Sequence, residues 1–388
     1  MEAESPVHPA AAAPAQPPQP SAAEPALELA ADGRYLVTGG LGFLGRHLVR
    51  RLLALGGEVT VFDNDNNRTS ARTAWLRAAE PAATGRLRTV AGDIRRPEDV
   101  QRALAGGSFR SVFHLAAYSV IERAAHDPAG AIATNALGTV NLLEALRRAP
   151  ATLPDSVVIA STDKVYGEME GTRYTEQSAL RGVGIYDAAK LAGDVMGQAF
   201  HQSFQVPTVV LRLCNVFGPD DPNWRYRLIP RALSFVFDPA GAAAPELYFE
   251  SIDHWRDYIY VDDVVTALLL AAVRPACRGE VFNIAGCVNL STPEVLRRVV
   301  EAAACHEGGL DPARAAKIMD NGFRVVVRGQ KPGVTTISRQ HLDGTKFGRC
   351  TAFRPRVGFD EGLERTARAA RAWHLGPAAR PELAGTAR

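Results

Sequence analysis

Short apolar runs alternate with amphipathic stretches from Tyr35 to about residue 220. The runs have the length and the β-branched content of buried strands, and they cover residues 35–38, 58–63, 87–90, 111–115, 156–160 and 208–213. The stretches between them carry apolar residues at helical spacing, most clearly at 43–55, 130–148 and 185–203. Strands that are apolar throughout and separated by helices predict a parallel sheet with helices on both faces. The expected fold class is therefore α/β, with a doubly wound parallel sheet.

The pattern becomes less regular after residue 220. Helical spacing is present near 227–237, 262–273, 292–305 and 360–374, and a short strand pattern, Val281–Ile284, lies between two of these stretches. Ser291 and Glu294 have the spacing of a capping box that opens the 292–305 helix. We expect residues 34–220, with a returning strand near 280–286, to form the main domain. Residues 221–375 should form a smaller, interleaved C-terminal α/β lobe.

The two ends of the chain differ from the rest in composition. Residues 1–33 contain seven prolines and eleven alanines but no Lys or Arg. This composition predicts a disordered tail rather than a secretory signal or a transit peptide. Residues 376–388 predict a similarly loose C-terminal tail.

Overall composition excludes several classes of protein. With 46% hydrophobic and 22% charged residues, the chain resembles an average soluble globular protein, and it contains no apolar run long enough to span a membrane. A net charge of +2 gives no electrostatic reason to expect nucleic-acid binding. The five cysteines have the spacing of neither a disulfide framework nor a zinc site. We expect a cytoplasmic protein without a metal site.

A glycine-rich turn lies between the first strand and the first helix. Gly40, Gly42 and Gly45 satisfy Gly-x-Gly-x-x-Gly, and Gly39 offers an alternative first glycine. Such a turn lets a pyrophosphate approach the backbone at the positive end of a helix, as in Rossmann-type domains. Asp63 ends the second strand, 24 residues after Gly39, where its carboxylate can accept both hydroxyls of a ribose. Its charge would repel a 2′-phosphate, so NAD is favoured over NADP.

Two further residues bear on the cofactor. Arg68 lies in the following loop and argues for NADP, in the opposite direction to Asp63. Asp93 follows the third strand and could reach an adenine ring, although Asp at this position also commonly caps a helix.

A phenol and an ammonium group are paired in the 185–203 helix. Tyr186 and Lys190 are four residues apart and therefore share one face of that helix. A nearby cation should lower the pKa of the phenol from about 10 and so allow it to act as a base. Ser161 and Thr162, at the end of the preceding strand, can orient a substrate oxygen.

With these motifs in order, the chain resembles the extended short-chain dehydrogenase/reductase family, in its sugar-nucleotide epimerase/dehydratase branch. The resemblance covers about residues 34–375 and extends to His114–Ala117, Thr134-Asn135, Asn215–Pro219 and Arg256–Asp262. It implies a Rossmann domain, bound NAD, a nucleotide-sugar substrate held by the smaller lobe, and a homodimer formed through helices near 130–148 and 185–203.

The resemblance also implies roles for individual residues. Asn215 would hold the substrate together with Thr162, and Arg256 and Arg328 would bind its diphosphate. The residues expected to contact the cofactor are Gly39, Gly42, Phe43, Leu44, Gly45, Asp63, Asn64, Asp93, Ile94, Leu115, Ala116, Ala117, Tyr186 and Lys190. Around Arg328 the family often shows Arg-x-Gly-Asp, whereas this chain has Arg328-Gly-Gln330 in place of the acid.

The segment from Ser161 to Gly167 distinguishes the reactions of this branch. Sugar 4,6-dehydratases resemble Ser-Thr-Asp-Glu-Val-Tyr-Gly at this point, with the Asp as general acid and the Glu as general base. This chain keeps Asp163 and has Lys164 in place of the Glu, as in CDP-glucose 4,6-dehydratases and in dehydratases that act on UDP-N-acetylglucosamine. Lysine is scarce here, five of the 44 basic residues.

Three functions compete to explain these residues. A 4,6-dehydratase would use Tyr186 to oxidise the sugar at C4, Lys164 to remove the C5 proton, and Asp163 to protonate the departing 6-hydroxyl. A 4-epimerase would need only Thr162, Tyr186 and Lys190. A non-catalytic NAD-binding sensor would typically lack the Tyr-Lys pair. The expected function is an NDP-hexose 4,6-dehydratase, with the 4-epimerase as the alternative.

Overall fold

The computed structural model describes residues 33–64, 85–149, 153–237, 246–249, 253–304, 324–327 and 336–375. Four predictions fall outside these residues: the N-terminal tail, apart from Gly33, the C-terminal tail at 376–388, the loop position of Arg68, and the diphosphate contact of Arg328.

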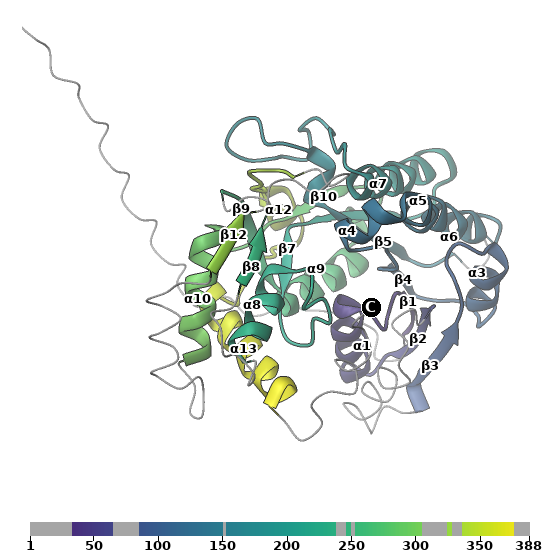
Figure 1. The fold of residues 1–388 in the computed structure, drawn as a ribbon. Helices are drawn as coiled ribbons and strands as arrows, with labels where there is room; N and C mark the ends of the chain where they lie inside the picture. The colour runs from purple at the N-terminus through teal and green to yellow at the C-terminus, as the bar shows by residue number, and fades with distance from the viewer. Residues whose placement is uncertain are drawn as a thin grey trace, which may run out of the picture.

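A seven-stranded parallel sheet forms the centre of the molecule (Figure 1). Its strand order is β10-β6-β5-β4-β1-β2-β3, and every neighbouring pair is parallel. The strands are β1 Arg34–Thr38, β2 Glu58–Asp63, β3 Leu87–Ala91, β4 Ser111–His114, β5 Ser156–Thr162, β6 Thr208–Leu213 and β10 Val281–Ile284. The predicted doubly wound sheet and its returning strand are therefore confirmed.

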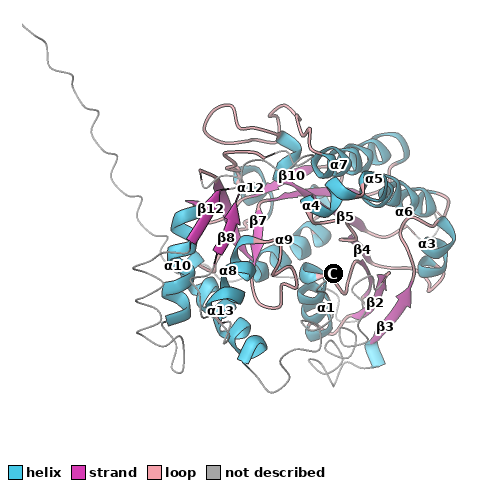
Figure 2. Cartoon of the chain, viewed as in Figure 1, coloured by secondary structure: helices cyan, strands magenta, loops and turns pink. Residues whose placement is uncertain are grey.

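Helices cover both faces of this sheet (Figure 2). On one face, α1 (Phe43–Ala54) and α9 (Val261–Val273) pack their apolar side chains against the strands. On the other face lie α3 (Pro97–Leu104), α6 (Gly138–Arg147) and α7 (Ile185–Phe204). Burial on both faces explains why the strands are almost continuously apolar.

The strand order reverses between β1 and β4. After β1 the chain builds outward through β2 and β3, then crosses back to β4 on the other side of β1. In open α/β sheets the crevice at such a switch point, beyond the carboxyl ends of the strands, is where ligands bind. Both the glycine-rich turn after β1 and the Leu115–Ala117 segment after β4 lie at this crevice.

The helix predicted at 130–148 is interrupted in the structure. After α4 (Ile121–His126), the chain forms α5 (Pro128–Ile132), a π-helical turn at Ala133–Leu137, and only then α6. The side chain of Asn135 in this turn accepts from the backbone N–H of Tyr118 at 2.7 Å and donates to its carbonyl at 3.2 Å. The wide turn thereby holds the segment that follows β4.

A smaller lobe packs beside the main sheet around a second hydrophobic core. It contains a three-stranded sheet, β11 (Val288–Ser291), β9 (Trp255–Tyr260) and β7 (Asn215–Phe217), and a parallel pair, β8 (Glu246–Phe249) and β12 (Arg324–Val327). Its helices are α8 (Leu228–Val236), α10 (Thr292–Ala304) and α13 (Phe359–Leu375), while α12 (Thr345–Thr351) packs against β10. The domain boundaries at 34, 220 and 375 stay predictions.

The predicted capping box at the start of α10 is confirmed. Both the backbone N–H and the hydroxyl of Ser291 donate to Glu294, at 3.0 and 2.7 Å, and the N–H of Glu294 donates back to the Ser291 hydroxyl at 3.4 Å.

A buried histidine links β4 to β1 and α6. Because the Thr139 hydroxyl donates to the carbonyl of Asn135 at 2.8 Å, it accepts from Nε2–H of His114 at 3.0 Å. Nδ1 of His114 then accepts from the Thr38 hydroxyl at 2.8 Å, and that hydroxyl accepts from the N–H of Ala116 at 3.2 Å. Burial, assisted by the Lys190 charge, lowers the pKa of His114 to about 3.

We expect His114 to stay neutral in the folded protein at pH values where the unfolded chain protonates it. Between pH 6.5 and about 3, unfolding therefore takes up about one proton at this residue, and the free energy of unfolding decreases as the pH falls. Chemical denaturation at several pH values should show a shallower dependence for His114→Gln than for the wild type, with the exposed His126→Gln as control. Equal slopes for wild type and His114→Gln would contradict this account.

Candidate active site

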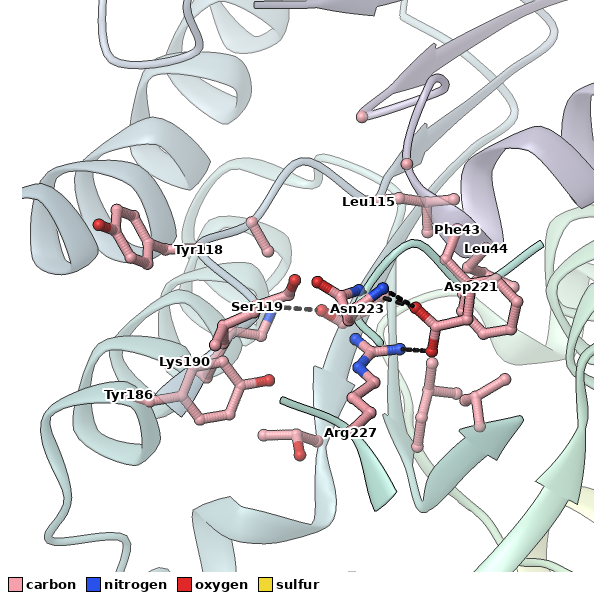
Figure 3. A pocket seen from close by; sticks show the side chains of 18 of the residues that line it. Phe43, Leu44, Leu115, Tyr118, Ser119, Tyr186, Lys190, Asp221, Asn223 and Arg227 are labelled. Carbon is pink, nitrogen blue, oxygen red and sulfur yellow. Dashed lines mark hydrogen bonds and ion pairs between the residues drawn. The ribbon is translucent and has the colours of Figure 1, made fainter. Parts of the chain in front are cut away.

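A cavity of about 650 Å³ lies at the carboxyl ends of β1, β4 and β5, and the smaller lobe contributes to its wall. Figure 3 shows that Tyr186 and Lys190 enter it from α7, opposite Asn223 and Arg227. The structure brings together at this cavity the following predicted residues: Gly39, Gly42, Phe43, Leu44, Gly45, Asp63, Asn64, Ile94, Leu115, Ala116, Ala117, Thr162, Asp163, Lys164, Tyr186, Lys190, Asn215 and Arg256.

The turn between β1 and α1 has the shape that a pyrophosphate requires. Gly39 has φ +70°, a left-handed conformation that other residues rarely adopt. A Cβ atom at Gly45 would fall on the carbonyl oxygen of Gly39, so α1 can approach the turn only because this residue is glycine. The N-cap of α1, Gly42, offers no side chain to the first N–H groups of the helix, which are therefore suited to an anion.

Asp63 faces this turn from the end of β2. Its carboxylate accepts from the N–H of Leu41 at 3.0 Å, and both Asp63 and Asn64 line the cavity. The acid thus lies where the sequence spacing predicts a ribose contact.

Asp93 is the one predicted cofactor residue among the described positions that does not line the cavity. Both of its carboxylate oxygens accept from the Arg95 guanidinium, at 2.5–3.0 Å, and these bonds hold the pKa of the carboxyl below its usual value. Arg95 and Ile94 line the cavity instead. Arg95 already occupies the Asp93 carboxylate, and Asp93 does not line the cavity. A contact between Asp93 and the adenine therefore stays a prediction.

Thr162, Asp163 and Lys164 follow one another where β5 ends in a short 3-10 turn, Asp163–Tyr166. The Thr162 hydroxyl accepts from the N–H of Lys164 at 3.4 Å and donates to Oδ1 of Asp163 at 3.2 Å. Oδ2 of Asp163 is buried and has no hydrogen-bond partner among the described residues. This oxygen is therefore available to a substrate group.

Burial shifts the pKa values of Asp163 and Lys164 in opposite directions. It raises the pKa of Asp163, although the positive charges of Lys164 and Arg256 oppose this shift. It lowers the pKa of Lys164, and the charge of Arg256 lowers it further. The neutral carboxyl and the neutral amine are both favoured relative to an exposed pair.

The structure corrects the expected interaction between Tyr186 and Lys190. Burial raises the pKa of Tyr186 to about 12, and the groups that oppose this shift are Arg227 and the Thr162 hydroxyl rather than Lys190. Nζ of Lys190 donates to the carbonyl of Ala160 at 2.5 Å, and burial lowers the pKa of Lys190 to about 8. The predicted lowering was wrong because desolvation of the phenol outweighs the nearby charges.

The predicted substrate residues have different surroundings. Asn215, which begins β7, lines the cavity, and its Nδ2 atom is buried without a partner among the described residues. Arg256 also lines the cavity, but its guanidinium donates to the backbone carbonyls of Trp255, Ser338 and Ile337. Arg256 is thus held in place by three backbone carbonyls.

A family model described as NAD dependent epimerase/dehydratase family matches residues 35–285. The chain belongs to this family.

Individual relatives agree with the family model. A dTDP-glucose 4,6-dehydratase of Streptomyces griseus is 33% identical over 338 residues, which cover 85% of this chain and 92% of the relative. A UDP-glucose 4-epimerase of Mycolicibacterium smegmatis is 30% identical over 337 residues, which cover 86% of this chain and 97% of the relative. The crystal structure of DesIV (dTDP-glucose 4,6-dehydratase) from Streptomyces venezuelae with NAD and TYD bound has a TM-score of 0.73 at 29% identity, with 88% of this chain and 98% of DesIV covered.

The protein is therefore an NAD-dependent enzyme, a sugar-nucleotide dehydratase or epimerase. Its own residues fit the cofactor, since the turn at Gly39 and Gly45 leaves space for a pyrophosphate and Asp63 supplies an acceptor for the ribose. Within the described ranges, no group of three or more His, Cys, Asp or Glu residues is arranged to hold a metal. In the same part of the chain, no helix combines the length and the hydropathy needed to cross a membrane.

The epimerase/dehydratase site contains two residues that the sequence did not predict, Arg227 and Gln340. Arg227, at the N-cap of α8, lies opposite Tyr186 in Figure 3 and forms an ion pair with Asp221 at 3.2 Å. Arg227 precedes α8 and lies far from Tyr186 in the chain, so no local pattern signals its proximity to the phenol. Gln340 accepts from Nζ of Lys164 at 3.1 Å and is 176 residues away in the chain, and no local pattern signals it.

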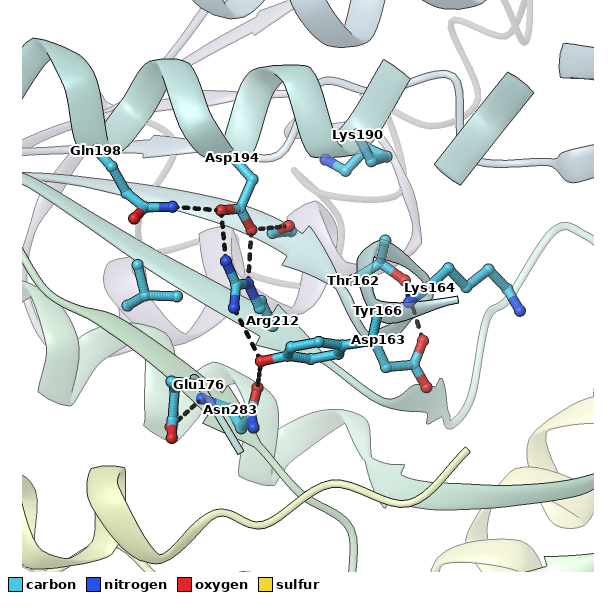
Figure 4. A network of polar contacts seen from close by, with 12 residues as sticks. Thr162, Asp163, Lys164, Tyr166, Glu176, Lys190, Asp194, Gln198, Arg212 and Asn283 are labelled. Carbon is cyan, nitrogen blue, oxygen red and sulfur yellow. Dashed lines mark hydrogen bonds and ion pairs between the residues drawn. The ribbon is translucent and has the colours of Figure 1, made fainter. Parts of the chain in front are cut away.

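A buried polar network supports the end of β5 from behind (Figure 4). Arg212 of β6 donates to both oxygens of Asp194 on α7, at 2.9 and 3.0 Å, and Asp194 also accepts from the Ser161 hydroxyl at 2.6 Å. Arg212 further donates to the Tyr166 hydroxyl at 2.9 Å, which donates to Asn283 on β10 at 2.7 Å. Ser161 directly precedes Thr162, so the network fixes the segment that carries the reacting groups.

We expect Asp194→Asn to lower the free energy of unfolding by about 3–5 kcal/mol, because it leaves the Arg212 charge buried without its counter-ion. Both side chains of this ion pair are at most 2% exposed. The control is Glu301→Gln, which removes the exposed pair with Arg297 on α10 and should cost less than about 1 kcal/mol. Chemical denaturation measures both, and similar small losses would contradict a supporting role for the network.

Proposed function

We propose that the protein is an NDP-hexose 4,6-dehydratase, which converts its substrate to the NDP-4-keto-6-deoxyhexose. The observation that carries the proposal is the adjacent pair Asp163 and Lys164, whose pKa values are shifted toward the neutral forms of both groups at one wall of the cavity. A neutral carboxyl can donate a proton and a neutral amine can accept one. Elimination of water needs both steps, whereas epimerisation at C4 needs neither.

Oxidation at C4 comes first. NAD, held by the turn at Gly39 and Gly45 and by Asp63, would supply the hydride acceptor for C4 and the hydride donor for C6. Thr162 orients the sugar 4-hydroxyl through its own hydroxyl, and Tyr186 accepts the proton from it. Because burial raises the pKa of Tyr186 to about 12, the phenolate depends on the charge of Arg227 and on the neighbouring Thr162 hydroxyl, which both oppose this shift.

Elimination follows once the 4-ketone has acidified the hydrogen at C5. Lys164 removes that proton with its neutral amine, and the C5–C6 double bond forms as the C6–O bond breaks. Asp163 donates its proton to the departing 6-hydroxyl, which leaves as water. Reduction at C6 and return of a proton to C5 complete the 4-keto-6-deoxy product. The unpartnered Oδ2 of Asp163 is the atom expected to meet the 6-hydroxyl.

The alternative is an NDP-sugar 4-epimerase, which would use only Thr162, Tyr186 and Lys190. A UDP-glucose 4-epimerase at 30% identity supports this alternative, while relatives named dTDP-glucose 4,6-dehydratase at 33% and 32% identity support the dehydratase. The nucleotide stays open, because the Asp163-Lys164 pair resembles CDP-glucose enzymes and the relatives are named for dTDP-glucose. Asn215 is expected to hold the substrate, and Arg256 and Arg328 to bind its diphosphate.

The products formed from a panel of NDP-hexoses distinguish the two reactions. We expect a 4-keto-6-deoxy sugar, detected by its alkaline absorbance, from at least one member of the panel. A substrate that yields only the C4-inverted sugar would overturn the dehydratase proposal.

We expect Lys164→Met to lower the elimination rate and deuterium exchange at C5 by about 100-fold or more, the contribution typical of a general base. Oxidation at C4, followed as reduced NAD, should persist because Lys164 does not act in that step. Lys346→Met removes a lysine paired with Glu280, away from the residues that line the cavity, and serves as the control. Unchanged exchange at C5 in Lys164→Met would remove this residue from the role of base.

We also propose a homodimer formed through the α5–α7 region, and a cytoplasmic location. These helices pack against one another and carry five large apolar side chains that are 37–56% exposed: Ile132, Leu137, Val195, Met196 and Phe204. Exposed apolar side chains gathered in this way favour a protein interface. Sedimentation should give a dimer for the wild type and a shift toward monomer for Leu137→Asp combined with Met196→Asp. A monomeric wild type at micromolar concentration would contradict the proposal.

A further inference from the structure

We propose that Gln340 is the positioning residue that aims Lys164 at the C5 hydrogen and keeps its amine free of a counter-ion. The inference rests on the proposed dehydratase function and adds a residue from the C-terminal part of the chain to its machinery. Gln340 is fully buried, at 0% exposure, and its Oε1 atom accepts from Nζ of Lys164 at 3.1 Å.

The backbone of Gln340 is fixed on both sides. Its N–H donates to the carbonyl of Trp255 at 3.0 Å, and its carbonyl accepts from Nδ2 of Asn289 at 2.7 Å. The same Asn289 amide donates to the buried Asp257 at 2.8 Å, and the other oxygen of Asp257 accepts from the N–H of Leu342 at 2.7 Å. A side chain that starts from so constrained a backbone is suited to hold its partner in one position.

Lysine needs such a partner because its four-carbon side chain is flexible. In the structure, Nζ of Lys164 donates to Gln340. The charged groups that act on this amine are Arg256, which disfavours its charged form, and three acids that favour it, Asp163, Asp187 and Glu122. Burial and Arg256 prevail, so the pKa of Lys164 lies below its usual value.

An amide is the functional group that this arrangement requires. A carboxylate at position 340 would attract the ammonium form and raise the pKa of Lys164, against the shift that burial and Arg256 produce. An apolar side chain would leave the amine without an orienting acceptor. The amide oxygen of Gln340 can accept from a neutral amine as well as from an ammonium group, and it adds no charge.

The other end of the amide points toward the proposed acid. Nε2 of Gln340 and Oδ2 of Asp163 are both buried and both lack a well-formed hydrogen bond among the described residues. They are nevertheless close enough that the amide lowers the pKa of Asp163 slightly against the larger effect of burial. Gln340 therefore neighbours both the acid and the base, and it leaves Oδ2 of Asp163 available to the 6-hydroxyl.

Two substitutions of Gln340 separate its orienting role from a structural one. Gln340→Glu introduces a charge that should raise the pKa of Lys164 by about 1–3 units, so the acidic limb of the pH profile for C5 deuterium exchange should move up by the same amount. At pH values below that limb the exchange rate should fall about tenfold per unit. Gln340→Met introduces no charge and should lower the exchange rate at every pH without moving the limb.

Oxidation at C4, measured as reduced NAD in a single turnover, should change less than about threefold in both variants, because Gln340 bonds to Lys164, which does not act in that step. Gln101→Glu, which adds the same charge at an exposed position on α3, is the control and should match the wild type. Thermal melting identifies a variant that fails to fold, and Gln340→Met still tests the contact if the Gln340→Glu protein is unfolded.

The inference is overturned if folded Gln340→Glu keeps the wild-type pH profile, or if Gln340→Met exchanges C5 deuterium at the wild-type rate. It is also overturned if both variants lose C4 oxidation and C5 exchange to the same extent, since that indicates general damage to the site. Failure of the proposed function looks different, because the wild type itself would then form no 4-keto-6-deoxy sugar from any NDP-hexose. That outcome would overturn the inference as well.

Discussion

Desolvation at the carboxyl end of β5 is the physical constraint on which the site depends. Burial there favours a neutral carboxyl at Asp163 and a neutral amine at Lys164, and it raises the pKa of Tyr186 to about 12. The shifts at Asp163 and Lys164 favour the protonated acid and the unprotonated base that an elimination uses. The shift at Tyr186 opposes its function, so the phenol relies on Arg227 and Thr162 to form its anion.

The parallel sheet buries the reacting groups, and contacts within the sheet and with α7 hold them in position. Asp194 and Arg212 form an ion pair behind Ser161, and the strand then delivers Thr162 and Asp163 to the cavity in a fixed orientation. On the opposite side, the smaller lobe supplies Gln340. The main domain and the smaller lobe therefore both contribute to the site, and Lys164 and Gln340, which are far apart in the chain, are in contact there.

Much of this arrangement could be predicted from the sequence, because it depends on local patterns. Apolar runs predicted the strands, and the spacing of Tyr186 and Lys190 predicted their common location at the cavity. Three features could not be predicted in this way. The π-helical turn around Asn135 depends on a tertiary contact with Tyr118, the pKa of Tyr186 depends on how completely it is buried, and Gln340 reaches Lys164 only through the fold of the smaller lobe.

The central claim is that the cavity carries out an elimination and not only a redox reaction at C4. The most direct measurement is the mass of the sugar product formed by the wild type in deuterium oxide. The account predicts a product that has lost one molecule of water and gained one deuterium at C5, because Lys164 removes that hydrogen and solvent replaces it. A C4-inverted sugar that retains its oxygen and carries no deuterium would contradict it.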